Sequence, residues 1–529
     1  MPFFTNSRFS AQSDLRPKTP TAPRFPYGKR APERLHPGKL IMSKTRMAIL
    51  TVLLLAAWSA RDIAAAPPSS RPNIIFIMAD DLGYTDVGCF GSKYYETPNI
   101  DRLATQGMKL LSHHHCQNCT PTRAALMSGQ YGHVNGVVNN HTPHPEGNLS
   151  LPALLRPAGY VSAYVGKWHY GNQSGKRPGF DYSASFVGQG KYLDCPVEVN
   201  GVATPTQGFI DDVTTDYAAG FIRENKDRPF LLILGYKTCH GPFTPPPRHE
   251  KTYEGSEARR TPNLGLQPPY RSADAGSVGA KGKAAAKPAD SATVPTNLGM
   301  FRGITAIDDN VGKLLNLLDE LKLVDDTMVC FSSDNGYYLG EHNLGDKRSA
   351  YEESLRVPML VRYPRLVAKA RTEDRMVLNV DPAVTFLDLA GVPVPAAMHG
   401  RSWKPLLEGK TDVAWRDSFF YCYFFERGFA TPTTTAVRTQ TAKLIKYPGH
   451  DDWTEVFDLK ADPYETKNLA ADPVHAGLRK SLEAEYEKQS QAIDFRIPEF
   501  ADEPPADGSL PSSGNKNQKQ NKAAKKAKA

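Results

Sequence analysis

Four continuous apolar runs stand out along the chain, and polar or ionisable residues follow each of them. An uninterrupted apolar run predicts a strand that is buried on both faces, as in a parallel sheet. Because ligands bind at the carboxyl edge of open α/β sheets, we expect the polar residues to converge on one cleft. The runs cover residues 72–79, 160–165, 230–235 and 327–333. The polar residues that follow are Asp80, Asp81, Lys167, His169, His240, Asp334 and Asn335.

Helical patterns lie between these runs and complete an α/β alternation. The clearest is 303–323, where Ile304, Ile307 and Val311 begin one apolar stripe at helical spacing that we interpret as core packing. Further helices are expected at 98–106, 151–158 and 377–390, with one more strand at 358–362.

The pattern changes after about residue 400, where β-prone runs become short. They are followed by a charged segment, 476–491, that predicts a helix. This part predicts a β-rich subdomain at 401–500 beside a catalytic domain at 67–400. The short runs are 419–425, 433–437, 443–447 and 456–459.

Two further segments differ in composition from the predicted folded parts. Residues 254–296 are rich in Gly, Ala, Ser, Pro and Lys and predict a flexible surface insertion in the catalytic domain. Residues 501–529 carry no periodicity and predict a disordered basic tail.

Residues 1–66 predict an N-terminal extension that ends in a signal peptide. A basic triplet at 44–46 precedes the apolar run 47–60, and Ala64 to Ala66 provide a small-residue cleavage site. We take Met42 as the expected initiator and a residue near Pro67 as the mature start. The apolar run is short for a bilayer span, so we expect export to the periplasm or outside the cell, with no stable membrane anchor.

The composition narrows the class of protein further. The 529 residues carry a net charge of +8, but much of it lies in the two ends of the chain. We find no basic stripe with a reading element, so nucleic-acid binding is not expected. Seven cysteines are too few and odd in number for a disulfide scaffold, although one or two bridges are compatible with export.

The stretch that carries the chemistry is 119–129, Cys-Thr-Pro-Thr-Arg-Ala-Ala-Leu-Met-Ser-Gly. Thr120 fits a helix N-cap and Pro121 fits the first helical position, which would place Cys119 just before a helix. The helix dipole and the nearby Arg123 favour an anion there, which is the outline of a nucleophile site.

Oxygen ligands from two strand ends predict a metal site beside Cys119. A single Asp pair is usually a turn or a cap, but Asp80 and Asp81 are matched by Asp334 and Asn335 at an equivalent strand end. Such hard ligands suit Ca²⁺ or Mg²⁺ rather than zinc.

The cationic side of the expected site consists of Lys167, His169, His240 and Lys347. A lone Lys or His is more often a surface or packing residue. Lys167 and His169, however, are two residues apart at a strand end and can point the same way. An ammonium binds anionic oxygens, and an imidazole transfers protons near neutral pH.

The histidines at 113–115, which precede Cys116 and Cys119, form only a weak metal or redox pattern because no second Cys-x-x-Cys follows. We expect these histidines to pack locally or to line the approach to the site.

Taken together, these motifs resemble the formylglycine-dependent type I sulfatases of the alkaline-phosphatase-like superfamily. The signature is complete in 119–129, and the likeness extends from Pro72 to about Leu469. The other segments that carry it are 72–81, 166–169, 333–336, 346–348 and 457–469. The resemblance implies an α/β sandwich with a large mixed, mostly parallel sheet and a small C-terminal antiparallel subdomain.

The resemblance also implies a mechanism. Cys119 would be converted to formylglycine by a formylglycine-generating enzyme; one hydroxyl of its hydrate attacks sulfur, and the other then expels sulfate. Asp80, Asp81, Asp334 and Asn335 would hold one Ca²⁺ together with residue 119. Arg123 would orient the diol, while Lys167 and Lys347 bind sulfate oxygens. His169 would deprotonate the diol and His240 would protonate the leaving oxygen, although His240 follows Lys-Thr-Cys where relatives often have Ala-Pro.

Within the family, residues 334–343 and 351–358 look most similar to carbohydrate sulfatases of the mucin-desulfating, N-acetylglucosamine-6-sulfatase-like group. His133 and His342 are candidate sugar contacts. Arylsulfatase and iduronate-2-sulfatase-like specificities stay open, as does a phosphodiester or phosphonate hydrolase on the same scaffold. A non-catalytic glycan-binding protein would require that Cys119 is never converted.

Overall fold

The computed structural model describes residues 71–92, 95–115, 118–256, 259–271 and 298–498. The predicted signal peptide, Met42, the basic tail and most of the predicted insertion lie outside these residues. No helix in the described part of the chain is long and apolar enough to cross a membrane.

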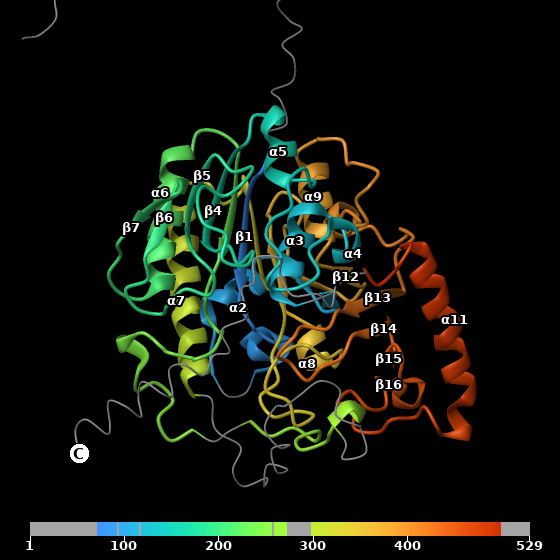
Figure 1. The fold of residues 1–529 in the computed structure, drawn as a ribbon. Coiled ribbons are helices and arrows are strands. Elements are labelled where there is room, and N and C mark those ends of the chain that lie inside the picture. The colour runs from blue at the N-terminus through green and yellow to red at the C-terminus, as the bar shows by residue number, and fades with distance from the viewer. Residues whose placement is uncertain (1–70, 93–94, 116–117, 257–258, 272–297, 499–529) are drawn as a thin grey trace, which may run out of the picture. The chain divides into compact units, whose positions relative to one another are not determined.

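A mixed, mostly parallel sheet of ten described strands forms the centre of the protein (Figure 1). Its order is β11-β2-β10-β9-β1-β8-β4-β5-β6-β7, and β1 pairs in parallel with both β8 and β9. Only β10, β6 and β7 run antiparallel to their neighbours. The strands are β1 (Asn73–Ala79), β2 (Met108–Leu110), β4 (Val161–Lys167), β5 (Tyr182–Phe186), β6 (Val197–Val199), β7 (Val202–Thr204), β8 (Phe230–Gly235), β9 (Thr327–Ser333), β10 (Met359–Arg362) and β11 (Arg371–Glu373).

Helices cover both faces of this sheet, because the buried strands carry apolar side chains on each face. Along β1, Ile75 and Ile77 pack into one core with α2, α6 and α7. Ile74 and Phe76 pack into the other core with α3, α5 and α9. The first group is α2 (Pro98–Thr105), α6 (Ile210–Asn225) and α7 (Leu298–Glu320), and the second is α3 (Cys119–Ser128), α5 (Leu151–Leu155) and α9 (Asp381–Leu389). The short helices are α4 (Gly132–Asn135), α8 (Glu352–Leu355) and α10 (Lys404–Leu407).

The predicted C-terminal β-rich part is a four-stranded antiparallel sheet among the described residues. Helix α11 (Ala476–Ala492) packs on it, with Leu482 buried against Val437 and Leu444. The strands are β13 (Ser418–Tyr423), β14 (Thr434–Thr439), β15 (Ala442–Lys446) and β16 (Glu455–Asp458). The expected fold class is therefore confirmed.

The prediction of a single helix at 377–390 was wrong in part. The segment 377–390 is not one helix, because Val377–Leu378 forms β12 and pairs with β3 (His113–His114) before α9 begins. The side chain of Asp381 accepts the backbone N–H of Leu378, which turns the chain at that point. His113 and His114 are buried in this small pairing, so the expectation of local packing is confirmed.

The described part of the predicted insertion is packed against the fold rather than lying loosely on its surface. Asn263 is fully buried and donates a hydrogen bond to Glu353. Arg259 forms ion pairs with Asp86 and Glu341. These contacts anchor Arg259 and Asn263 on the catalytic domain, and the flexibility predicted for the insertion as a whole stays a prediction.

Candidate active site

The polar residues that follow the buried strands do converge on one edge of the sheet. In the β1–β9 register Ala79 is paired with Ser333, so Asp80 and Asp334 leave adjacent strands side by side. Strand β8 lies on the other side of β1 and β4 lies beyond it, which brings His240 and Lys167 to the same edge. The convergence expected from the four apolar runs is therefore confirmed.

Four residues at this edge could hold a metal ion: Asp80, Asp81, Cys119 and Asp334. One ligand atom from each lies within 4.8 Å of the others, and all four residues are buried. Asn335 is also buried, and its Oδ1 has no hydrogen-bond partner among the described residues. An orphaned amide oxygen beside three carboxylates is what an oxygen-preferring cation would satisfy, so this site fits Ca²⁺.

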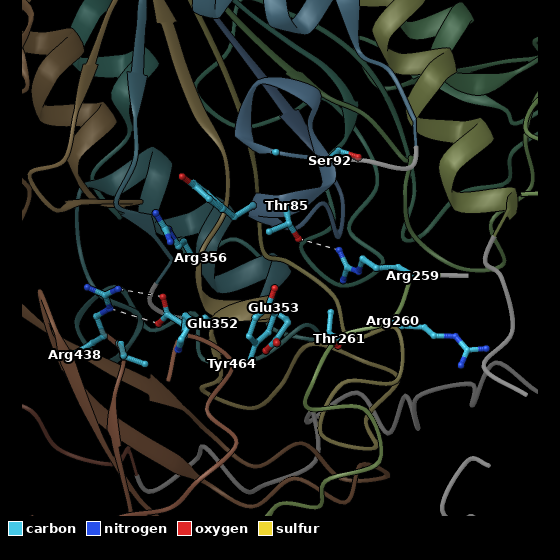
Figure 2. Close-up of a pocket in the computed structure, with 14 residues that line it drawn as sticks. Thr85, Ser92, Arg259, Arg260, Thr261, Glu352, Glu353, Arg356, Arg438 and Tyr464 are labelled. Carbon is cyan, nitrogen blue, oxygen red and sulfur yellow. Dashed lines mark hydrogen bonds and ion pairs between the residues drawn. The ribbon is translucent and has the colours of Figure 1, made fainter. Parts of the chain in front are cut away.

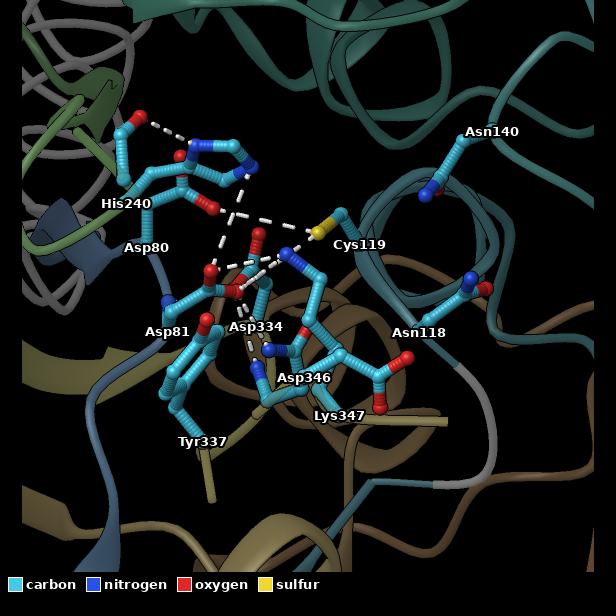
Figure 3. Close-up of polar contacts among 12 residues, drawn as sticks. Asp80, Asp81, Asn118, Cys119, Asn140, His240, Asp334, Tyr337, Asp346 and Lys347 are labelled. Atoms are coloured by element: carbon cyan, nitrogen blue, oxygen red, sulfur yellow. Dashed lines mark hydrogen bonds and ion pairs between the residues drawn. The ribbon is translucent and has the colours of Figure 1, made fainter. Parts of the chain in front are cut away.

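Helix α3 brings Cys119 to the carboxylates. The helix begins at Cys119, with Asn118 as its N-cap, so the predicted cap at Thr120 was wrong by two positions. Cys119 Sγ lies 3.8 Å from Asp80 Oδ1 and 3.9 Å from Asp81 Oδ1 (Figure 3). Burial, together with the negative charge of Asp334, raises the pKa of the Cys119 thiol well above its ordinary value. The thiol is therefore not activated as a thiolate, despite its helix start.

Arg123 lies one turn further along α3 and is directed at the metal cluster. Its Nε and Nη2 donate to Asp334 Oδ2 at 3.2 and 2.7 Å, and its Nη1 donates to the carbonyl of Lys167 at 2.8 Å. Burial would lower the pKa of Arg123, but the Asp334 carboxylate raises it. Arg123 thus links the helix that carries Cys119 to the ends of β4 and β9.

Lysines surround the acidic cluster on both sides. Lys167 Nζ forms an ion pair with Asp80. Lys347 Nζ lies 2.8 and 2.7 Å from the two oxygens of Asp81 (Figure 3). Burial would raise the pKa of Asp80, but the positive charges of Lys167 and Arg123 hold it well below its ordinary value. Burial and the nearby Asp80 instead raise the pKa of Asp334 to about 6.

The two histidines differ in how they are held. His240 is partly open, with 22% of its side chain exposed, and its Nε2 lies 3.9 Å from Asp81 Oδ2. Burial and the positive charge of Lys347 lower its pKa to about 3. His169 is buried, and its Nε2 lies 2.8 Å from Gln189 Nε2. Burial and Lys167 lower the pKa of His169 well below its ordinary value.

A supporting network around Glu426 has no signal in the sequence. Glu426 lies after β13 in the C-terminal sheet, and its Oε2 accepts two hydrogen bonds from Arg348, at 2.8 and 2.7 Å. Its Oε1 accepts from Asn118 Nδ2 at 3.1 Å and from the backbone N–H of Asn140 at 2.9 Å. One carboxylate thereby holds the residue before Cys119 and the residue after Lys347.

The two candidate sugar contacts, His133 and His342, make packing contacts within the fold. His342 is buried and stacks on Tyr351, with ring centroids 3.8 Å apart. His133 Nε2 lies 3.0 Å from the carbonyl oxygen of Ile493, at the end of α11. These contacts do not test sugar binding, so the roles of His133 and His342 as sugar contacts stay a prediction.

Fold and site together define a class of enzyme. A buried cluster of hard oxygen ligands, ringed by Lys, Arg and His at the carboxyl edge of an α/β sheet, suits the hydrolysis of an anionic ester. Residues 72–392 match the Sulfatase family, and residues 340–492 match N-sulphoglucosamine sulphohydrolase, C-terminal. The chain belongs to the sulfatase family and is a sulfuric ester hydrolase, as the resemblance in its motifs had implied.

Individual relatives extend this comparison. An N-acetylglucosamine-6-O-sulfatase of Bacteroides thetaiotaomicron is 31% identical over 484 residues, covering 78% of this chain and 85% of that enzyme. A structure solved with its substrate, D-glucosamine-2-N,6-O-disulfate, has a TM-score of 0.73 at 28% identity and covers 80% of this chain and 98% of that chain. The phosphonate monoester hydrolase of Agrobacterium radiobacter has a TM-score of 0.65 at 21% identity, covers 80% of this chain and 96% of that chain, and shares the fold.

Proposed function

We propose that this chain hydrolyses 6-O-sulfate esters of N-acetylglucosamine or glucosamine units, using formylglycine at position 119 and one Ca²⁺. The substrate class rests on the Bacteroides relative, whose name gives the 6-O-sulfate of N-acetylglucosamine, and on the neighbour solved with a glucosamine disulfate. The observation that carries the chemistry is the position of Cys119. It heads α3 within 4 Å of Asp80 and Asp81, beside the unpartnered Asn335 oxygen.

Formylglycine and Ca²⁺ would each supply one kind of chemistry. A hydrated formylglycine at 119 would supply the attacking hydroxyl and a second hydroxyl to expel sulfate. A Ca²⁺ held by Asp80, Asp81, Asp334 and Asn335, together with residue 119, would neutralise oxyanion charge.

The remaining residues of the site bind the sulfate group or transfer protons. Lys167 and Lys347, buried beside the carboxylates, bring positive charge for the sulfate oxygens. Arg123 orients residue 119, and His169, held by Gln189, accepts a proton there. His240 is the partly open histidine and gives a proton to the leaving oxygen. An anionic substrate beside His240 would raise its low pKa towards the working range.

Replacing Cys119 with Ser tests the nucleophile. A serine hydroxyl can attack sulfur, but it cannot form the aldehyde that expels sulfate, so we expect at most one turnover per enzyme molecule. The assay is sulfate release in a burst format, with mass spectrometry of the trapped sulfated peptide. Cys89→Ser, at a half-buried thiol outside the site, is the matched control and should retain turnover. Sustained turnover by Cys119→Ser would refute the mechanism.

The two proposed groups can be observed directly. Mass spectrometry of the residue-119 peptide from the native host should show the mass of formylglycine, produced by a formylglycine-generating enzyme during export. An unmodified thiol there would contradict the proposal. Calorimetric titration of chelator-treated protein with Ca²⁺ should give one site, and Asp334→Asn should abolish it.

A substrate panel separates the specificities that remain. N-acetylglucosamine-6-sulfate should be cleaved faster than an aryl sulfate or a 2-sulfated iduronate. A matched aryl phosphonate should be poor, because the single-metal site with two lysines favours sulfate. Preference for the phosphonate would favour the phosphonate hydrolase instead.

A further inference from the structure

A second polar pocket lies outside the cluster around Cys119. Its volume is about 400 Å³, and four separate segments form its walls (Figure 2). One segment follows the metal-site strand β1 and contributes Thr85 and Ser92. The others contribute Arg259 and Thr261, then α8 with Arg356, and finally the C-terminal sheet with Arg438 and Tyr464.

Several buried polar atoms on the walls of this pocket have no hydrogen-bond partner among the described residues. They are Ser92 Oγ, Thr261 Oγ1, Arg259 Nε and Glu353 Oε2. The side chain of Arg259 is only 10% exposed, so solvent does not readily reach it. Buried polar atoms in folded proteins are nearly always bonded. These atoms lie beneath the pocket surface, so they make its walls polar but are not themselves open to an occupant.

The charge of the pocket favours an anionic occupant. Arg356 Nε donates to the carbonyl of Leu111 at 2.9 Å, and the guanidinium stacks 3.7 Å from the Tyr84 ring. No described carboxylate lies within ion-pair distance of it. Arg438 lies 3.2 Å from Glu352, but Lys443 also pairs with that carboxylate at 2.8 Å. Burial raises the pKa of Glu353 to about 8, which leaves this carboxyl neutral and able to donate a hydrogen bond.

The rim of the pocket adds an aromatic surface. Tyr464 is 42% exposed and lines the same pocket as Glu353 (Figure 2). An exposed aromatic ring beside an arginine that has no carboxylate partner among the described residues suits a sugar ring that carries a negative charge. The pocket also has the volume of a small-molecule site.

We propose that this pocket binds an acidic sugar unit, one that carries a sulfate or a carboxylate, other than the unit being hydrolysed. That it serves the same glycan rests on the proposed function. Thr85, on the wall of the pocket, follows the metal-cluster residue Asp81 by four residues, so their Cα atoms are at most about 14 Å apart.

A negative charge introduced at Ser92 tests the pocket. Ser92→Glu adds a carboxylate to the pocket wall, and Ser92→Gln adds the same bulk without charge. The probes for titration calorimetry are two disaccharides that the active site cannot hydrolyse, one with a uronic acid and one with a 6-sulfonate. We expect Ser92→Glu to bind at least one probe about tenfold more weakly than Ser92→Gln does, which is about 1.4 kcal/mol. The probe that responds identifies carboxylate or sulfate as the recognised group.

Equal binding of both probes by the two variants would overturn the proposal. Inorganic sulfate that binds as tightly as the sulfonate disaccharide would also overturn it, because the sugar would then contribute nothing. If Ser92→Glu does not fold, Tyr464→Ala replaces it, with Val474→Ala as the control, because Val474 is exposed on a different segment. Tyr464→Ala should weaken binding about threefold, and unchanged affinity would refute the sugar contact.

Hydrolysis of the monosaccharide 6-sulfate is measured in parallel. Its failure in the wild-type enzyme would contradict the proposed function, whereas the calorimetric result would stand on its own.

Discussion

At the scale of single residues, neighbouring charges shift the pKa values of two buried carboxyl groups in opposite directions. Asp80 and Asp334 are both fully buried, yet the pKa of Asp80 lies well below its ordinary value and that of Asp334 is raised to about 6. Lys167 forms an ion pair with Asp80, whereas Asp334 must also accommodate the negative charge of Asp80. The sequence provides only ordinary pKa values, and these predict neither the lowered pKa of Asp80 nor the raised pKa of Asp334.

Glu353 gives a testable pH dependence of stability. Burial and the nearby Glu465 raise its pKa from 4.5 to about 8. The folded state therefore binds this proton more tightly than the unfolded state does, and the free energy of unfolding should fall as the pH rises from about 4.5 to 8. Glu353→Gln cannot ionise and should remove this decline, which is about 5 kcal/mol for a shift of this size. Denaturant unfolding at several pH values measures it.

The control for that prediction is Glu487→Gln, at an exposed position on α11, which should leave the slope unchanged. His342, Glu341, Glu465 and Lys443 also lie near Glu353 or its neighbours and are unchanged in both variants. Only the difference between the two variants is therefore informative. A decline of the same size in Glu353→Gln would contradict the assignment.

At the scale of elements, continuous apolar runs were a good guide to the sheet. Strand β9 has the bounds expected from 327–333, and β8 those expected from 230–235. Helix boundaries were predicted less accurately than strand boundaries, because helix caps depend on tertiary contacts. Thr120 could not serve as the N-cap of α3, because its side chain donates to the carbonyl of His169 and its N–H donates to Asn140.

Gly166, at the end of β4, should not tolerate a side chain. Its φ is +91°, and a Cβ there would lie 2.0 Å from the carbonyl oxygen of Gly235 on β8. Gly166→Ala would force the strands apart and displace Lys167, so we expect a loss of about 3 kcal/mol of stability and most of the activity. Thermal unfolding and sulfate release check this.

The matched control is Gly220→Ala in α6, where a Cβ meets no atom within 4 Å. Alanine favours a helix over glycine by about 1 kcal/mol, so this variant should be neutral or more stable. Equal losses in the two variants would show that the crowding at Gly166 is not responsible.

At the scale of the whole molecule, the C-terminal sheet completes the active site. Glu426→Gln should leave Arg348 buried without a full counter-charge and loosen Asn118 beside Cys119. We expect a loss of about 3 kcal/mol of stability, as for other broken buried ion pairs, and a lower kcat with little change in KM. Chemical denaturation and steady-state kinetics measure both.

The exposed pair Arg479–Glu483 on α11 provides the comparison for Glu426. Glu483→Gln should cost less than about 0.5 kcal/mol and leave kcat unchanged. A normal kcat in Glu426→Gln would indicate that Glu426 only supports the fold.

The sequence predicted the fold class and the cluster of site residues, because both depend on local patterns. Buried runs followed by Asp, Lys or His can be recognised without tertiary information. The Glu426 network, the packing roles of His133 and His342, and the second pocket depend on contacts between segments far apart in the chain. No periodicity or motif marks Glu426, since a single Glu after a strand is common.

The hydrogen bond between Asn118 and Glu426 can form only after the C-terminal part of the chain has been synthesised. The two residues are separated by 308 positions, and chains are synthesised from the N-terminus. While those residues are being added, the segment that carries Cys119 has not yet received its carboxylate anchor. A nascent chain therefore presents this segment in a looser state than the finished protein does. That interval gives another protein its best access to position 119, and it closes when the last third of the chain folds.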